Sequence, residues 1–266
     1  MAEVLLKLKE KIGITVEAEV IRPDGFAGKS AAEIQALPVW QGPRKLALSE
    51  LFDVELRDGA SAQPGETAIF MEGDLSRVKR IGQGMKEGKI EISGSAGMHL
   101  GEEMSGGSIL VKGDAGSWAG MEMKGGSIRI QGNAADHVGS AYRGSWRGMT
   151  GGEIRIEGNA RSALGAGLVG GRIIVEGDVE NFCGIRQSGG AIIIKGSAVR
   201  GLGAEMNGGI IAVCGSIRQF SPGFVYSTRE TDPVIGEVRL EGSYSRFTGD
   251  YSLGKNVKGT LYSREG

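Results

Sequence analysis

A repeat of about 19 residues constrains the fold of this chain more than any other feature of its sequence. One unit runs from Gly94 to Lys112 and follows the pattern G-[NDS]-x5-G-x2-M-x-G-G-x-I-x-[VI]-x. Five of the eight intervals between starting glycines are 19 residues long, and the other three are longer because they contain insertions. The starting glycines are Gly73, Gly94, Gly113, Gly132, Gly158, Gly177, Gly196 and Gly215, with a looser last unit at Gly242. A fixed period of this length is typical of stacked repeat architectures.

Each unit contains the two patterns that a coil needs, a short strand and tight corners. Ile-x-Val or Ile-x-Ile, as in Ile109–Val111, alternates with a period of two, so one face of a short strand points inward. The Gly-Gly pair before it supplies positive φ at one corner, and Gly followed by Asn, Asp or Ser makes a second turn. Equivalent strands joined by crossovers are parallel, and such crossovers are almost always right-handed. We therefore predict a mainly β fold, a single-stranded right-handed parallel β-helix of eight to nine coils.

Two other solenoids fit the sequence less well. A left-handed hexapeptide helix, which would favour an acyltransferase, needs a six-residue rhythm of aliphatic residues, and 19 is not a multiple of six. A calcium-binding roll needs a G-G-x-G-x-D nonapeptide, which is absent from the sequence.

The flanking segments do not follow the repeat. Residues 1–65 contain short apolar strands and a capping box, Ser30 to Glu33, that begins a helix, so we predict a small N-terminal α+β cap. Residues 66–218 are the regular coils, and residues 219–266 are degenerate last coils with a C-terminal cap. Both caps are expected because the open ends of a β-helix expose strand edges and a hydrophobic core.

Composition narrows the classes of function. The net charge is −1, so no global field attracts nucleic acid or an anionic membrane surface. No 18-residue apolar stretch and no signal-peptide core is present, and we expect a cytoplasmic protein. Cys183 and Cys214 stand far apart without a C-x-x-C partner, which predicts free thiols and no disulfide or zinc site.

Two repeat positions form columns of similar residues. The first is predicted to be a flexible core filler and holds Met85, Met104, Met123, Met149, Leu168, Gln187 and Met206. The second should face outward and holds His99, Trp118, His137, Ala163, Phe182, Gly201 and Phe220. An outward aromatic ladder indicates a packing or partner surface, with a ligand site as the alternative.

The outward positions of the strands lose their charges in the later coils. Polar residues there give way to Ile174, Ala191, Ile193, Ile210, Ala212 and Cys214. Stacked together, they form an apolar face larger than a soluble monomer usually exposes to solvent. We expect an interface with another subunit; the alternative is that the C-terminal segment of the same chain covers the face.

The coil from Gly132 to Gly158 contains a seven-residue insertion with two arginines and two aromatic residues: Tyr142, Arg143, Trp146 and Arg147. Loops on rigid scaffolds often carry function, and this composition is typical both of interface hot spots and of anion sites. We favour a partner protein over an anionic ligand. Motifs for catalysis, such as G-x-S-x-G, H-E-x-x-H or a phosphate loop, are absent, so no catalytic or metal-binding residue is predicted.

Three strings resemble a known family. They are Gly113–Gly120, the loop Tyr142–Met149 and Phe26–Ser30, and they resemble the C subunit of formylmethanofuran dehydrogenase and its bacterial counterpart in the formyltransferase/hydrolase complex. The repeat is also similar to the β-helix domain of the glutamate synthase large subunit. The loop and the N-terminal string favour the one-carbon family.

The resemblance implies a non-catalytic scaffold subunit of a cytoplasmic complex of one-carbon metabolism that transfers or hydrolyses formyl groups on methylofuran or methanofuran. The C subunit of a tungsten or molybdenum formylmethanofuran dehydrogenase is the alternative within the family; the tail, which lacks extra Cys or His, favours the bacterial complex. Partners would be amidohydrolase-like, formyltransferase-like or molybdopterin-dehydrogenase-like subunits. The redox or hydrolytic centres would belong to them, so this chain is expected to bind no cofactor.

Two other hypotheses remain open at this point. Arg143 and Arg147 could hold the anionic glutamate arm of the furan carrier by charge-assisted hydrogen bonds. The chain could also be a stand-alone β-helix binding module or an acyltransferase-like enzyme, which would be active in isolation.

Overall fold

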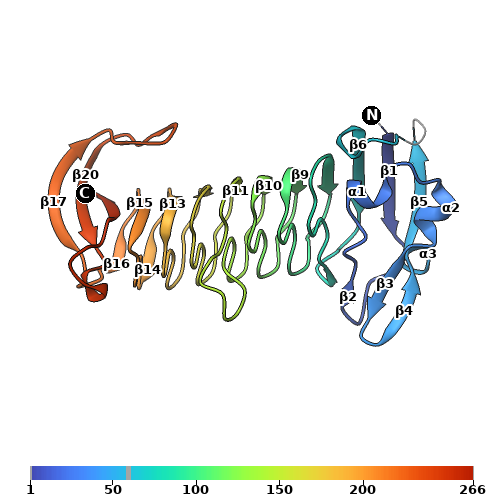
Figure 1. The fold of residues 1–266 in the computed structure, drawn as a ribbon, viewed down its shortest axis with the longest axis horizontal. Helices are drawn as coiled ribbons and strands as arrows, with labels where there is room; N and C mark the ends of the chain where they lie inside the picture. Colours follow the sequence, from blue (N-terminus) through green and yellow to red (C-terminus); the bar gives the residue numbers. More distant parts are fainter. Residues whose placement is uncertain (1, 58–60, 266) are drawn as a thin grey trace.

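The computed structural model describes residues 2–57 and 61–265, and within them the molecule is a mainly β rod. Figure 1 shows the coils stacked along the long axis, with strands and short helices at the N-terminal end and a group of strands at the C-terminal end. One 13-stranded sheet runs through the whole rod, in the order β17-β20-β21-β15-β13-β12-β11-β10-β9-β8-β6-β1-β5. The predicted caps include residues 1, 58–60 and 266, which lie outside the described residues.

Eight parallel strands form the central part of this sheet, one from each coil. They are β6 (Thr67–Glu72), β8 (Lys89–Ile92), β9 (Ser105–Val111), β10 (Gly125–Ile130), β11 (Glu153–Ile156), β12 (Arg172–Val175), β13 (Ser188–Ile194) and β15 (Gly208–Val213). Their register pairs equivalent residues, so Ile109 lies beside Ile128 and Ile128 beside Ile154. In-register pairing therefore places each inward isoleucine directly over the one before it, even across the insertion between Ile128 and Ile154, and these residues are buried.

Glycine is needed at the corner before each strand. The second glycine of each Gly-Gly pair has a φ between 66° and 88°, a region that L side chains rarely adopt. A Cβ built on Gly126 would lie 2.7 Å from the carbonyl oxygen of Gly107 in the preceding coil. The chain thus uses glycine both for the turn and for the close approach of neighbouring coils.

A second ladder joins the coils at the Gly-Asn/Asp/Ser turn. Single parallel bridges link Ala96, Ala115 and Ala134 and continue to Ala198, where the short strands β14 (Ala198–Arg200) and β16 (Ile217–Gln219) pair. Side chains reinforce this ladder, because the side-chain oxygen of one residue, Oδ1 of Asp or Asn or Oγ of Ser, accepts a hydrogen bond from the backbone N–H of its equivalent in the next coil. Asn133 N donates to Asp114 Oδ1 at 2.7 Å, for example. This explains why each unit requires a short polar residue at that position.

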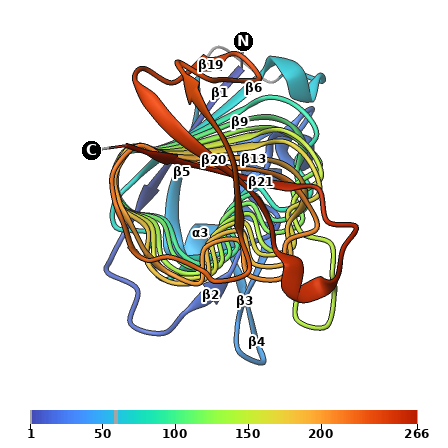
Figure 2. The same ribbon diagram turned by 90° about the vertical axis from the view of Figure 1, so that its left-hand side faces the viewer.

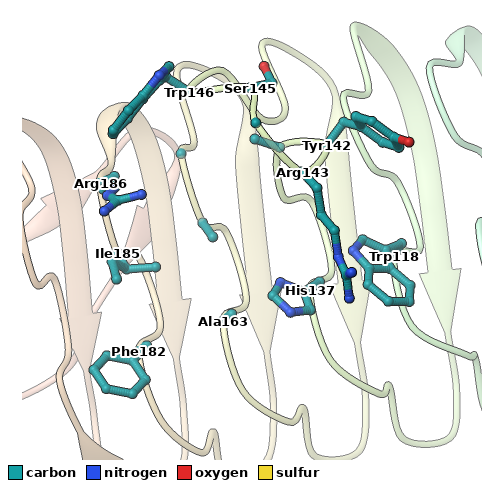
Figure 3. Close-up of a pocket in the computed structure, with 14 residues that line it drawn as sticks. Trp118, His137, Tyr142, Arg143, Ser145, Trp146, Ala163, Phe182, Ile185 and Arg186 are labelled. Atoms are coloured by element: carbon teal, nitrogen blue, oxygen red, sulfur yellow. The ribbon is translucent and has the colours of Figure 1, made fainter.

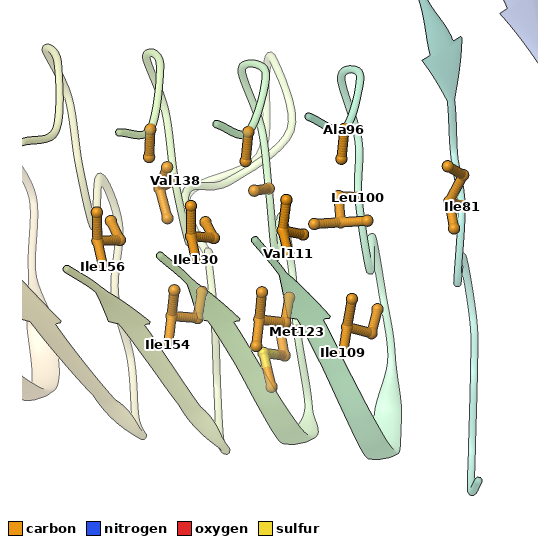
Figure 4. Close-up of a cluster of buried hydrophobic side chains, with 14 of the residues drawn as sticks. Ile81, Ala96, Leu100, Ile109, Val111, Met123, Ile130, Val138, Ile154 and Ile156 are labelled. Carbon is orange, nitrogen blue, oxygen red and sulfur yellow. The ribbon is translucent and has the colours of Figure 1, made fainter. Parts of the chain in front are cut away.

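The methionine column lies inside the rod, as predicted. Met85, Met104, Met123, Met149, Leu168 and Met206 are fully buried, and Figure 4 shows Met123 among the inward isoleucines of neighbouring coils. Gln187 takes the same position, also buried, and its amide nitrogen donates to the carbonyl oxygens of Gly189 (3.0 Å) and Gly190 (3.1 Å). Corner carbonyls thus satisfy its amide nitrogen, while its buried Oε1 accepts no hydrogen bond from the described residues.

The N-terminal segment extends the rod. Strand β1 (Ala2–Leu8) pairs parallel with β6 and antiparallel with β5 (Phe52–Arg57), so it continues the main sheet. The predicted capping box is present, since Ser30 Oγ accepts from Glu33 N at 3.3 Å and Ser30 N donates to Glu33 Oε2 at 2.8 Å. The other elements of this end are β2 (Val16–Glu17), α1 (Pro23–Phe26), α2 (Ala31–Gln35), β3 (Pro38–Gln41), β4 (Arg44–Ala47), α3 (Leu48–Leu51), η1 (Pro64–Glu66) and β7 (Val78–Lys79).

The C-terminal segment ends the sheet with strands of mixed direction. Strand β21 (Gly259–Arg264) pairs parallel with β15, and β20 (Ser243–Gly249) then pairs antiparallel with both β21 and β17 (Val225–Thr231). The last parallel strand of the main sheet, β21, thus lies within the looser unit that begins at Gly242, and that unit departs from the repeat because its first strand, β20, runs antiparallel. A small hairpin, β18 (Val234–Ile235) with β19 (Val238–Arg239), and the turn η2 (Tyr251–Leu253) complete this end.

The apolar face of the later coils is covered by this segment, which corrects the expectation of an interface with another subunit. Ile174, Ile193 and Ala212 are buried together with Ile235 of the hairpin and Tyr244 of β20. The other members of this cluster are Leu240 and Tyr262, with Ala191, Ile210, Cys214 and Val238 partly buried against them. In Figure 1 the hairpin arm reaches back over the coils from the C-terminal strands. The outward strand positions of the later coils are apolar because the C-terminal segment of the same chain packs on them. This was the alternative to a subunit interface.

Replacing Ile193 with Lys should lower the free energy of unfolding by about 3–5 kcal/mol, because a charge would be buried under the hairpin without a partner. Leu110→Lys is the matched control. Leu110 occupies the same column in an earlier coil, beside Glu91 and Arg129, and is not fully buried. Its effect should stay within about 0.5 kcal/mol. Urea denaturation of both variants measures this, and equal stabilities would contradict the covered face.

Candidate functional site

A column of residues on successive coils shares one unusual backbone conformation. Their φ values lie between 59° and 66°, in the left-handed region, and the column holds Arg80, His99, Trp118, His137, Ala163, Phe182 and Gly201. Since successive coils repeat at about 4.8 Å, rings at this position stack on one another. His99 and Trp118 have centroids 5.3 Å apart with an 8° angle between planes, and Trp118 and His137 have 5.3 Å and 3°. The outward aromatic ladder predicted from the sequence is therefore a continuous stack over three coils.

The stack is interrupted at Ala163. A methyl group takes the place of a ring there, and the next ring in the column belongs to Phe182, which is 42% exposed. Phe182 leans over the following coil, because a Cβ built on Gly201 would lie 2.5 Å from Phe182 Cδ1. One face of the His137 ring thus points along the column toward a position that has no ring (Figure 3).

The insertion forms a loop that folds over this interruption, and both of its ends are anchored. Ala141 N donates to Ala166 O at 3.0 Å, and Gly148 N donates to Gly167 O at 2.8 Å, which ties the loop to the next coil. On the other side Tyr142 N donates to Glu122 Oε1 at 3.0 Å. The loop therefore has a defined position relative to the aromatic column.

The tip of the loop presents large side chains to solvent. Trp146 is 69% exposed and Tyr142 is 58% exposed. The guanidinium of Arg186 lies over the Trp146 ring, 4.6 Å from its centroid, and Arg186 also pairs with Glu205 at 2.8 Å. This cation–π contact fixes the orientation of the most exposed aromatic side chain.

Arg143 extends from the loop toward His137 and Trp118, as Figure 3 shows. Among the described residues, no carboxylate oxygen lies within 4.0 Å of the guanidinium nitrogens of Arg143 or Arg147, whereas Arg186, two coils further on, is paired with Glu205. Two cationic groups are thus available to an anionic group from outside the chain.

Two hollows flank Trp146. The first, a groove of about 330 Å³, lies between the loop and the aromatic column and is lined by Trp118, His137, Tyr142, Arg143, Ala163, Phe182 and Arg186 among others. The second, about 540 Å³, is lined by Arg147, Val169, Asn207 and Leu253 and shares Trp146 and Arg186 with the first. Figure 2, which looks along the rod, shows the insertion loop and the turn at η2 on the same side. Both hollows together form one extended surface.

The four loop residues named from the sequence are brought together at this surface, but the two arginines are divided between its hollows. The four late-coil residues, Ile174, Ile193, Ile210 and Ala212, lie apart from it under the C-terminal segment. Sequence reasoning missed Arg186, which contacts Trp146 from two coils further on. It also missed that Ala163 interrupts the aromatic stack. The available signal was a small residue at a position where neighbouring coils hold rings.

The chemistry available at this surface is recognition of aromatic, apolar and anionic groups. Further along the aromatic column, Glu102 Oε2 lies 2.8 Å from Arg80 Nη1 and 3.3 Å from His99 Nδ1. Of the two cysteines, Cys183 is buried, and burial raises the pKa of its thiol. In residues 2–57 and 61–265 no three His, Cys, Asp or Glu side chains gather where they could hold a metal ion, and no helix is long and apolar enough to cross a membrane.

Removing the Arg186 guanidinium should loosen the loop. Arg186→Met keeps an unbranched apolar stem but loses a cation–π contact worth about 0.5–1 kcal/mol, so amide exchange over residues 141–148 should accelerate about two- to fivefold. Arg155→Met is the control, since Arg155 is a surface arginine paired with Glu176 on the sheet face. Hydrogen exchange with mass spectrometry measures the rates; unchanged exchange in the loop would show that Arg186 does not hold it.

Comparison with known proteins identifies the family. No family model matches the chain. The chain is 74% identical over 262 residues to the C subunit of molybdenum-containing formylmethanofuran dehydrogenase 1 from Methanosarcina barkeri, covering 98% of this chain and 86% of that one. It is 43% identical over 104 residues to the C subunit of tungsten-containing formylmethanofuran dehydrogenase 2 from Methanothermobacter thermautotrophicus, 38% of this chain and 36% of that one. A chain of the formyltransferase/hydrolase complex of Methylorubrum extorquens, solved in complex with methylofuran, matches with a TM-score of 0.83 and 26% identity, covering 98% of this chain and all of that one. The chain therefore belongs to the family of the formylmethanofuran dehydrogenase C subunits.

Proposed function

We propose that this chain is a non-catalytic scaffold subunit of a formylmethanofuran dehydrogenase. Identity of 74% to a dehydrogenase subunit, against 26% to the hydrolase-complex chain, supports the dehydrogenase of the two alternatives. The reaction on the carrier, methanofuran, would take place on other subunits, molybdopterin-dehydrogenase-like and amidohydrolase-like. This chain would bind no cofactor of its own and would work in the cytoplasm.

The scaffold would be a single-stranded right-handed parallel β-helix. The in-register parallel ladder and the 19-residue period support the β-helix, and the strong bias of parallel crossovers supports its hand. Residues 1–65 would act as one cap, 66–218 as the coils and 219–266 as the other cap. A rod of this kind is stiff because every coil is bonded to both neighbours, which suits a subunit that holds others at fixed positions.

The observation that carries the proposal is the exposed surface formed by the loop and the aromatic column. Tyr142, Trp146 and Phe182 are 58%, 69% and 42% exposed, although large aromatic side chains are usually covered. Tyr, Trp and Arg are the residues that dominate binding energy at protein interfaces. We therefore assign this face, with Tyr142, Arg143, Trp146 and Arg147, to the docking of a partner subunit.

Contact with the glutamate arm of the carrier is the weaker alternative for the two arginines. Arg143 lines the first hollow and Arg147 lines the second, with Trp146 between them, so one anionic group would not meet both at once. A partner protein that covers both hollows could place a separate acidic side chain against each arginine.

Trp146→Ala should weaken assembly of the complex about 30-fold or more, as expected for a central aromatic anchor. Trp40→Ala is the matched control, because Trp40 is 38% exposed on strand β3 of the N-terminal cap, away from the loop. The dissociation constant is measured by titrating each variant into the remaining subunits, reconstituted without this chain. Equal dissociation constants for the Trp146 variant and the unaltered chain would contradict the proposed docking face.

A further inference from the structure

The interruption at Ala163 leaves a slot of defined width in the aromatic column. His137 and Phe182 belong to coils on either side of the coil that contains Ala163, so their backbone positions are about 10 Å apart at the coil spacing. Rings elsewhere in the column are stacked at 5.3 Å. The slot therefore has room for one further ring, inserted from outside, at nearly the spacing that the column already uses.

The walls of the slot determine what kind of ring it accepts. His137 offers the open face at the end of a three-ring stack, Ala163 contributes only a methyl group, and Phe182, whose ring leans toward Gly201, bounds the far side. Ring pairs of this kind are worth about 0.5–1.5 kcal/mol beyond the area that they bury. A flat aromatic group thus fits the slot better than a branched aliphatic one.

A positive charge lies at the His137 end of the slot. Arg143 reaches from the loop toward His137, and none of the described carboxylates lies within 4.0 Å of its guanidinium (Figure 3). A carboxylate next to the inserted ring would form a charge-assisted bidentate hydrogen bond with it. The recognised feature is therefore an aromatic ring with an acidic neighbour.

We infer that this slot receives an aromatic side chain of a partner subunit, with an adjacent Asp or Glu of that subunit paired to Arg143. A protein segment is the occupant that the surface favours, because the groove continues past Trp146 into the second hollow and two more exposed aromatic side chains lie along it. Small-molecule sites are more enclosed and cover most of their ligand. The inference rests on the proposed function, which makes this chain a subunit of a complex.

Filling the slot from within tests the inference. Ala163→Trp should complete the column without disturbing the fold, because Trp118 and Phe182 hold large rings at φ values of 62° and 59°, close to the 60° of Ala163. The variant should keep its thermal stability and bind the remaining subunits, reconstituted without this chain, about 30-fold more weakly. Ala163→Ser keeps the slot open and is the control that should bind normally. Ala163→His, with a smaller ring, replaces the Trp variant if that variant does not fold.

The outcomes separate this inference from the proposed docking face. A folded Ala163→Trp or Ala163→His chain that assembles with an unchanged dissociation constant overturns the slot, while loss of binding by Trp146→Ala would leave the docking face standing. If neither position affects assembly, both proposals fail.

Arg143→Glu should weaken binding, because the new carboxylate would repel the acidic side chain of the partner. Salt screens this repulsion, so the difference in dissociation constant between the variant and the unaltered chain should be smallest at high salt. Equal binding of Arg143→Glu and the unaltered chain at low salt contradicts the acidic neighbour.

Discussion

In-register hydrogen bonding between successive coils is the interaction on which the rest of this structure depends. It places each residue directly over its equivalent in the preceding coil, as Ile109, Ile128 and Ile154 show. Every repeat position therefore forms a column of neighbouring side chains, and residues of the same kind at that position contact one another along the rod. The same constraint buries the methionines, stacks three aromatic rings and links the turn residues Asp114 and Asn133.

Departures from the repeat make the candidate functional surface, because a regular column can be altered only by a substitution or an insertion. Ala163 removes one ring from an aromatic stack, and the insertion places Arg143 near His137 and Trp118 on one side of that position and Trp146 near Arg186 on the other. Each change would be minor on an irregular protein. On a rod whose neighbouring positions are fixed by the backbone, they produce a groove with aromatic walls and one charged edge. A stiff frame with one such face fits a subunit that holds its partners in place.

The sequence predicted what the local period determines and missed what depends on contacts between distant segments. The strands, the corner glycines, the buried Met123 and the outward stack of Trp118 follow from position within one unit. The covering of Ile193 by Tyr244 does not, because those residues lie far apart in the chain and Tyr244 belongs to no regular unit. The contact of Trp146 with Arg186 likewise depends on how an irregular loop folds. The loop residues could thus be named from composition, but their neighbours could not.

The loop and the aromatic column together form the face that we propose meets a partner. Comparing hydrogen exchange of this chain alone and within the assembled complex tests that proposal most directly. The amides of residues 141–148 and those around Ala163 and Phe182 should become protected on assembly, while the coils covered by the C-terminal segment around Ile193 should change little. Protection confined to other faces, with unchanged exchange in the loop, would contradict the proposal.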